Sequence, residues 1–162
     1  MASVVCDVML PPFQTLLDTN REEIYRFLIA SVGSNDAEDC FQDTFMAALA
    51  AYPDLRDATN LRGWLFTIAH HKAIDCHRRR SRMEIPAADL PETPAPAEPH
   101  LLDQALWTRV QALPPKQRSA IVLRYVGDLP FRTIGGVLGC SESAARQNVR
   151  AGLIHLREEI RQ

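Results

Sequence analysis

Hydrophobic positions in the first half of this chain recur at helical spacing, and no alternating strand pattern extends beyond a few residues. The pattern predicts a first helix from about Phe13 to Val32, with the polar stretch 18–20 as a candidate break. A second helix is expected after Gly33, capped by Ser34 or Asn35 and stopped by Pro53. A third is expected over 61–82. The N-terminal half therefore predicts a small all-α bundle.

The second half contains two short helical patterns joined by a tight turn, between Leu129 and Leu156. The first ends at Gly139, which tolerates a left-handed backbone, and Ser141 offers a side-chain oxygen to cap the second. The second helix is expected to bury a narrow stripe comprising Ala144, Ala145, Val149, Leu153 and Leu156. Its outer side then carries Arg146, Gln147 and Arg150, with Asn148 close to them. Such side chains read purine edges in the major groove, so the pattern favours a helix-turn-helix over an ordinary helical hairpin with solvated charges.

The segment 83–100 has a different composition from its surroundings, with five prolines and almost nothing that could join a core. It is interpreted as a flexible, acidic, proline-rich linker. The sequence therefore predicts two small all-α domains, 1–82 and 101–162, joined by this linker.

Charge is segregated along the chain, although the formal net charge is only −2. Residues 1–60 carry ten acids and three bases, whereas 61–82 carry six bases and one acid. Residues 83–104 carry five acids and no base, and the remainder carries nine bases and four acids. Two basic blocks separated by an acidic one indicate two contacts with nucleic-acid phosphates.

The predicted second and third helices present different candidate surfaces. The second is expected to bury Phe41, Phe45, Ala48, Leu49 and Tyr52. An acidic outer face is then left, which is usually only solvated.

The predicted third helix carries Trp64, which is expected in the core. It also carries His70 and His71, which are hard to bury together because adjacent helical positions point about 100° apart. Aromatic and imidazole groups interleaved with Arg and Lys suit single-stranded DNA.

Composition narrows the classes of function and location that remain open for this chain. The four cysteines are widely spaced with no CxxC pair, which favours reduced thiols, with a redox sensor as the alternative. No apolar run is long enough for a membrane span, and the N-terminus lacks a basic start, so we expect a cytoplasmic protein. A metal or hydrolytic enzyme using His70, His71, Cys76 and His77 has neither ligand spacing nor a nucleophile motif. We expect no enzyme, no metal and no cofactor.

Three motifs in order make a specific resemblance: DAEDCFQDTFMAAL, LRGWLFTIAHHKAID followed by RRR, and LPPKQRSAIVLRYVGDLPFRTIGGVLGCSE. Together they resemble bacterial RNA polymerase sigma factors of the extracytoplasmic-function class. The resemblance covers about 13–160. It implies an N-terminal domain that binds core RNA polymerase and melts the minus-ten promoter element, and a C-terminal domain that reads the minus-thirty-five element. It also implies an anti-sigma partner.

The resemblance assigns roles to three sets of residues. The polymerase-binding set comprises Asp39, Gln42, Asp43 and Met46. The minus-ten set comprises Arg56, Asp57, Thr59, Asn60, Arg62, Trp64, His70, His71, Lys72, Arg78, Arg79 and Arg80. The minus-thirty-five set comprises Arg132, Ser141, Ser143, Arg146, Gln147, Asn148 and Arg150. His71 stands where the family commonly has Asn, so the minus-ten preference does not transfer directly.

A stand-alone helix-turn-helix regulator is the alternative function. It would bind an operator tightly without polymerase, and its N-terminal half would sense a signal or form a dimer. The acidic face, the second basic block and the lack of an obvious coiled-coil seam disfavour it.

Overall fold

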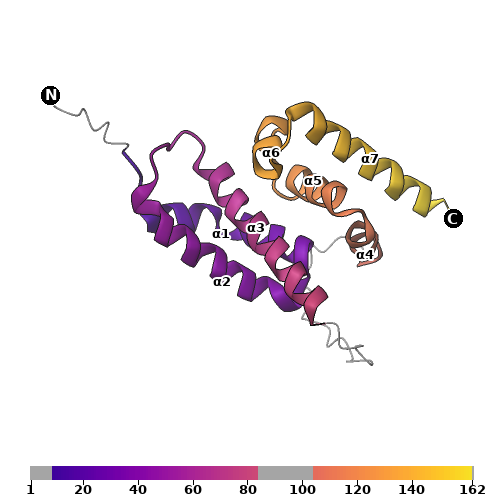
Figure 1. The fold of residues 1–162 in the computed structure, drawn as a ribbon, viewed down its shortest axis with the longest axis horizontal. Helices are drawn as coiled ribbons and strands as arrows, with labels where there is room; N and C mark the ends of the chain where they lie inside the picture. Colours follow the sequence, from indigo (N-terminus) through magenta and orange to yellow (C-terminus); the bar gives the residue numbers. More distant parts are fainter. Residues whose placement is uncertain (1–8, 84–103, 162) are drawn as a thin grey trace.

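The computed structural model describes residues 9–83 and 104–161, which form helices and their connections (Figure 1). No strand occurs within these ranges. The helices are α1 (Phe13–Val32), α2 (Ser34–Ala51), a 3-10 turn η1 (Tyr52–Asp54), α3 (Leu61–Arg82), α4 (Gln104–Ala112), α5 (Pro115–Tyr125), α6 (Phe131–Leu138) and α7 (Glu142–Ile160). The all-α prediction is confirmed, whereas the interpretation of 83–100 as a linker falls almost entirely on residues outside the described ranges.

The helices α1, α2 and α3 pack against one another as the N-terminal module, residues 9–83. Their shared core contains Ile24, Phe27 and Leu28 from α1 together with Leu65 and Phe66 from α3, each at most 1% exposed. The helices α1 and α3 therefore each bury an apolar face in this core.

Two local predictions in this module are wrong. The helix α1 is continuous through residues 18–20, because the Asn20 amide donates to the Leu16 carbonyl at 2.8 Å and the Thr19 hydroxyl donates to the Thr15 carbonyl at 2.7 Å. Polar groups that find partners inside the helix do not interrupt it. The N-cap of α2 is Gly33 rather than Ser34 or Asn35, and no side chain caps this end. Gly33 has φ +86°, a backbone that other residues rarely adopt.

The helices α5, α6 and α7, with α4 beside them, form the C-terminal module, residues 104–161. The predicted turn is confirmed, since α6 ends at Gly139 with φ +66° and the Ser141 hydroxyl accepts from the Ala144 N–H at 3.1 Å. The helices α5 and α7 approach closely at Gly152, where an added Cβ would lie 2.4 Å from the Ile121 side chain.

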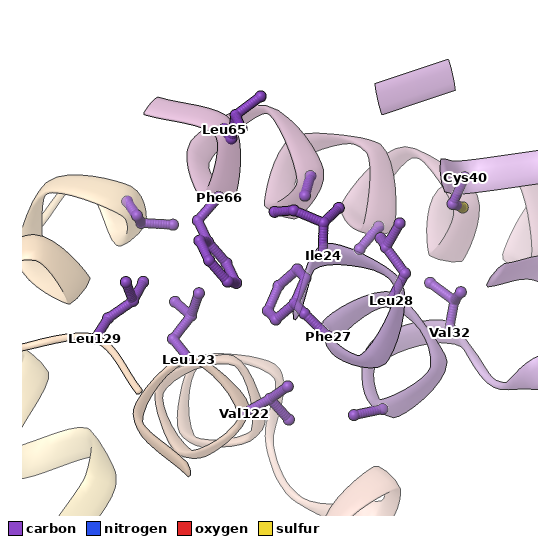
Figure 2. Close-up of a cluster of buried hydrophobic side chains, with 14 of the residues drawn as sticks. Ile24, Phe27, Leu28, Val32, Cys40, Leu65, Phe66, Val122, Leu123 and Leu129 are labelled. Carbon is purple, nitrogen blue, oxygen red and sulfur yellow. The ribbon is translucent and has the colours of Figure 1, made fainter. Parts of the chain in front are cut away.

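The two modules pack together through a continuous apolar core (Figure 2). The helix α3 contacts α6, and α1 contacts α5. Figure 2 shows Phe27 and Phe66 facing Val122, Leu123 and Leu129 of the C-terminal module. All five side chains are at most 1% exposed. The molecule described is therefore a closed arrangement of both modules, not two separate bodies.

Candidate nucleic-acid and protein interfaces

The outer face of α2 is exposed as the sequence predicted. Asp39, Gln42, Asp43 and Met46 all face solvent, and Met46 is 71% exposed. Leu49, expected inside, is instead 55% exposed one turn beyond Met46. Helical periodicity places Leu49 near the edge of the apolar face, so only the packing of α1 and α3 decides its side. The structure thereby adds an apolar residue to this acidic surface, which the spacing of Met46 and Leu49 could have indicated.

The connection before α3 is ordered by its own polar side chains. The Asp57 carboxylate accepts from the Thr59 N–H at 2.8 Å, and hydrogen bonding by Thr59 lowers the pKa of Asp57. The Asn60 side-chain oxygen Oδ1 caps α3 by accepting from the Gly63 N–H at 2.9 Å. A Cβ at position 63 would lie 2.5 Å from the Asn60 amide nitrogen, so the cap requires Gly63. Arg56, Asp57, Thr59 and Asn60 are all exposed on this connection.

Arg62 lies between the two modules rather than free on the surface. Its Nε donates to Glu23 at 2.8 Å, and its Nη2 donates to the Gly127 carbonyl of the C-terminal module. Its guanidinium also lies 5.4 Å from the centre of the Phe66 ring. The Asn60 amide reaches Thr133 of α6 at 3.5 Å. Two residues of the minus-ten set therefore contact the C-terminal module in the closed arrangement.

The rest of the minus-ten set divides along α3. Trp64 is half-buried against the Tyr52 ring, with centroids 6.1 Å apart, so its expected core position is partly realised. His71 is exposed, Lys72 is partly exposed, and Arg78, Arg79 and Arg80 are exposed at the end of the helix. Arg79 pairs with Asp43 at 4.0 Å and Arg80 pairs with Asp36 at 3.0 Å. These surface ion pairs are weak, so they leave the basic run available to another partner.

His70 is only 7% exposed whereas His71 is exposed, in agreement with the expectation that these two adjacent residues are hard to bury together. Burial lowers its pKa to about 4, with a further contribution from His71. His70 lines a cavity together with Pro115, Arg118 and Ser119 of α5, a proximity that the sequence of α3 alone does not reveal.

This burial predicts a pH-dependent stability. The unfolded chain takes up a proton at His70 below about pH 6.5, whereas the folded chain takes it up only near pH 4. Stability from this residue is therefore complete above pH 6.5 and is lost as the pH falls toward 4. We expect the free energy of unfolding to fall by about 2 kcal/mol between pH 7 and pH 5 because of His70. Urea unfolding of the wild type and of His70→Leu at both pH values measures this loss. We expect the variant to lack it. An equal loss of unfolding free energy in both proteins would contradict the role of His70.

The buried cysteines Cys40 and Cys76 lack the features of a reactive or metal-binding site. Cys40 and Cys76 are buried neighbours, and burial, followed by the influence of Cys76, raises the pKa of Cys40 to about 12. A buried thiol with a raised pKa is a poor nucleophile. His77, which the enzyme alternative also used, is engaged by the backbone, because its Nε2–H donates to the Ser31 carbonyl at 2.9 Å. No three His, Cys, Asp or Glu side chains in the described ranges are grouped to hold a metal ion.

The outer face of α7 carries the residues predicted to read DNA. Arg146, Gln147 and Arg150 are exposed, and Asn148 is partly exposed beside them. Arg146 pairs with Glu142 at 3.0 Å and lies 4.5 Å from the centre of the Phe131 ring. Phe131 stacks against Arg124 as well, at 4.8 Å. The aromatic ring therefore orients Arg146 at the start of the helix, where helix-turn-helix proteins contact bases. Arg132, Ser141 and Ser143 are exposed nearby.

Comparison with known proteins gives two matching family descriptions along the chain. Sigma-70 region 2 matches residues 16–83, and Sigma-70 region 4 matches residues 103–156. The chain is also 31% identical to the ECF RNA polymerase sigma factor SigD of Mycobacterium tuberculosis strain H37Rv, over 90% of this chain and 75% of that protein. This chain belongs to the extracytoplasmic-function family of sigma-70 factors. The resemblance drawn from its three motifs is confirmed.

Other relatives agree with this assignment. The sigma factor is 30% identical to the ECF RNA polymerase sigma factor SigE of Mycolicibacterium smegmatis, over 93% of its own length and 62% of that relative. It thus spans less than two thirds of that protein. Among solved structures it resembles the sigma factor RpoE of Bartonella quintana, crystallised with the anti-sigma factor NepR. That match has a TM-score of 0.79 at 25% identity, covering 92% of this chain and 96% of the other.

The match to RpoE extends over both modules. A TM-score of 0.79 across 92% of the chain requires that the two modules sit similarly in both proteins. The closed arrangement of this sigma factor therefore resembles that of RpoE in its complex with the anti-sigma factor NepR. Within the described residues, no helix combines the length and the hydropathy needed to cross a bilayer.

Proposed function

We propose that this sigma factor binds core RNA polymerase and directs transcription initiation at promoters with minus-ten and minus-thirty-five elements. Residues 1–82 would bind polymerase and open the DNA, and residues 101–162 would read the upstream element. The chain would act in the cytoplasm and perform no covalent chemistry, since the polymerase carries the catalysis. One observation supports this proposal most strongly. Each of the two modules matches a sigma-70 family description, and each exposes its expected contact face to solvent, on α2 and on α7.

The geometry of each face supports its role. The α2 surface combines Asp39, Gln42 and Asp43 with the apolar Met46 and Leu49, a composition suited to a protein partner with a basic, partly apolar groove. The α7 surface presents guanidinium and amide groups at the start of a capped helix, the arrangement that reads base edges.

Promoter opening requires the closed arrangement to separate. Arg62 and Asn60 contact Gly127 and Thr133 of the C-terminal module, so they cannot meet a DNA strand until these contacts break. Flipping a base out of the duplex costs a few kcal/mol, which stacking and phosphate contacts from the exposed end of α3 would offset. Because the similar RpoE structure is a complex with the anti-sigma factor NepR, we further propose an anti-sigma partner for this chain.

Run-off transcription tests the proposal. Core polymerase plus this protein on a promoter library should yield transcripts that share a two-part upstream motif. Specific duplex binding by the protein alone, without transcription, would instead support a stand-alone regulator. The region 2 match over residues 16–83 disfavours that alternative, because an operator-binding regulator has no need of this module.

The upstream specificity depends on Arg146 in this proposal. Arg146→Ala should relax selection at the minus-thirty-five element by about tenfold for one base pair, because a bidentate Arg contact discriminates by about 1–3 kcal/mol. The measurement is transcription from paired promoters that differ at single upstream positions. Arg157→Ala, an exposed arginine farther along α7, is the matched control and should leave this selection unchanged. Unaltered selection in Arg146→Ala would contradict the placement of the recognition face.

A further inference from the structure

A cavity of about 390 Å³ lies where the two modules meet. Its walls come from the end of α1, the second half of α3 and the first turn of α5. Neither module encloses it alone. Its volume falls within the range of small-molecule sites, and its lining is mainly apolar with a few polar groups, as such sites usually are.

Among the described residues that line this cavity, the charged side chains are all arginines. Arg78, Arg82 and Arg118 line it, and none of them takes part in the ion pairs recorded for the described residues. No described carboxylate lines it either. Asp36, an acidic group that influences His77, is paired with Arg80. Three guanidinium groups around one cavity, with no carboxylate of the described residues among its lining, are suited to bind an anion.

One buried and one half-buried side chain also line this cavity. His70 is 7% exposed and lines the cavity, and none of the described residues offers its ring a hydrogen bond. Arg118 is half-buried, and one of its nitrogens donates to the Gln111 carbonyl at 2.8 Å. Its other donors make no hydrogen bond to another described residue. The cavity also meets α5 at Pro115, where the positive end of the helix dipole favours a negative group.

We propose that this cavity binds a phosphate-bearing small molecule of about the size of a nucleoside diphosphate. The phosphates would lie against Arg78, Arg82 and Arg118, which can form bidentate, charge-assisted hydrogen bonds with their oxygens. The ring of the ligand would lie on the apolar wall formed by Ala73, Ile74 and Pro115. His70 would donate its ring N–H to the ligand.

Binding at this position stabilises the closed arrangement, because the ligand touches α3 and α5 at once. It also covers Arg78, which belongs to the minus-ten set. The ligand thus opposes separation of the modules. Ligand binding depends only on the free chain and is measured without polymerase. A negative binding result is therefore distinguishable from a failure of the proposed function in transcription.

Isothermal titration of the full chain with ADP and with pyrophosphate tests the proposal. We expect saturable binding to one site, absent for adenosine, and a rise of about 5 °C in thermal midpoint at saturation. Arg118→Gln should weaken binding at least about tenfold because it removes a charge-assisted phosphate contact. The matched control is Arg157→Gln on α7, which should bind as the wild type does.

Ser119→Asp provides a second variant, since it places a carboxylate in the cavity while keeping all three arginines. It should abolish binding of both probes, and urea unfolding of each variant without ligand establishes that it is folded. Equal affinity in wild type and Arg118→Gln would overturn the proposal, as would no binding of either probe. Binding of a short single-stranded oligonucleotide, but not of ADP or pyrophosphate, would overturn it in favour of a DNA-phosphate contact.

Discussion

Replacing Phe66 by Ala should lower the free energy of unfolding by about 3–5 kcal/mol, the usual cost of removing a fully buried aromatic ring. Phe66 is 0% exposed and meets the Phe27 ring at a T-shaped angle, with centroids 5.4 Å apart. It also faces Leu123 and Leu129 from the other module (Figure 2). Urea unfolding followed by circular dichroism measures the loss.

The same experiment tests the closed arrangement. Phe66 would be partly exposed if the modules were separate in solution, and its removal would then cost much less. A loss below about 1 kcal/mol, or two separate unfolding transitions in the wild type, would contradict the shared core. Leu49→Ala is the control, because Leu49 is 55% exposed and should change stability by no more than about 0.5 kcal/mol.

Replacing Asp43 by Arg should abolish promoter-directed transcription while leaving the fold intact. Asp43 is exposed on the α2 face proposed to bind core polymerase, and reversal of its charge opposes a basic partner there. Placing like charges across an interface costs several kcal/mol, so we expect at least a hundredfold loss of affinity for core polymerase, given about 1.4 kcal/mol for each factor of ten. Run-off transcription and a direct binding titration with core polymerase both measure it.

The control for this charge reversal is Asp18→Arg, which changes the same charge on the exposed surface of α1. It should transcribe as the wild type does. Asp43 also lies 4.0 Å from Arg79, so a stability measurement on Asp43→Arg is needed, although an exposed pair at this distance contributes little. Full transcription by a folded Asp43→Arg protein would exclude this part of α2 from the polymerase contact.

The local features of this protein followed from its sequence. Helical periodicity predicted the main helices, and Gly139 and Ser141 marked the turn and the cap that define the helix-turn-helix. The exposure of Asp43 and Arg146 also followed, because one apolar stripe on a helix determines which side is left outside. These features depend on contacts between residues close in the chain, and such contacts are visible in a single sequence.

Only the tertiary structure decided which surfaces meet. A periodic apolar stripe does not state which partner will cover it, so the sequence did not reveal that Phe66 and Leu129 share one core. The same limit applied to His70, which is buried by the packed modules, and to Arg62, whose partners Glu23 and Gly127 lie 39 and 65 residues away. Among the site residues named by resemblance, Asn60 and Arg62 thus contact the other module, whereas Asp43 and Arg146 are exposed. That difference arises because long-range packing, not local propensity, decides what each helix face touches.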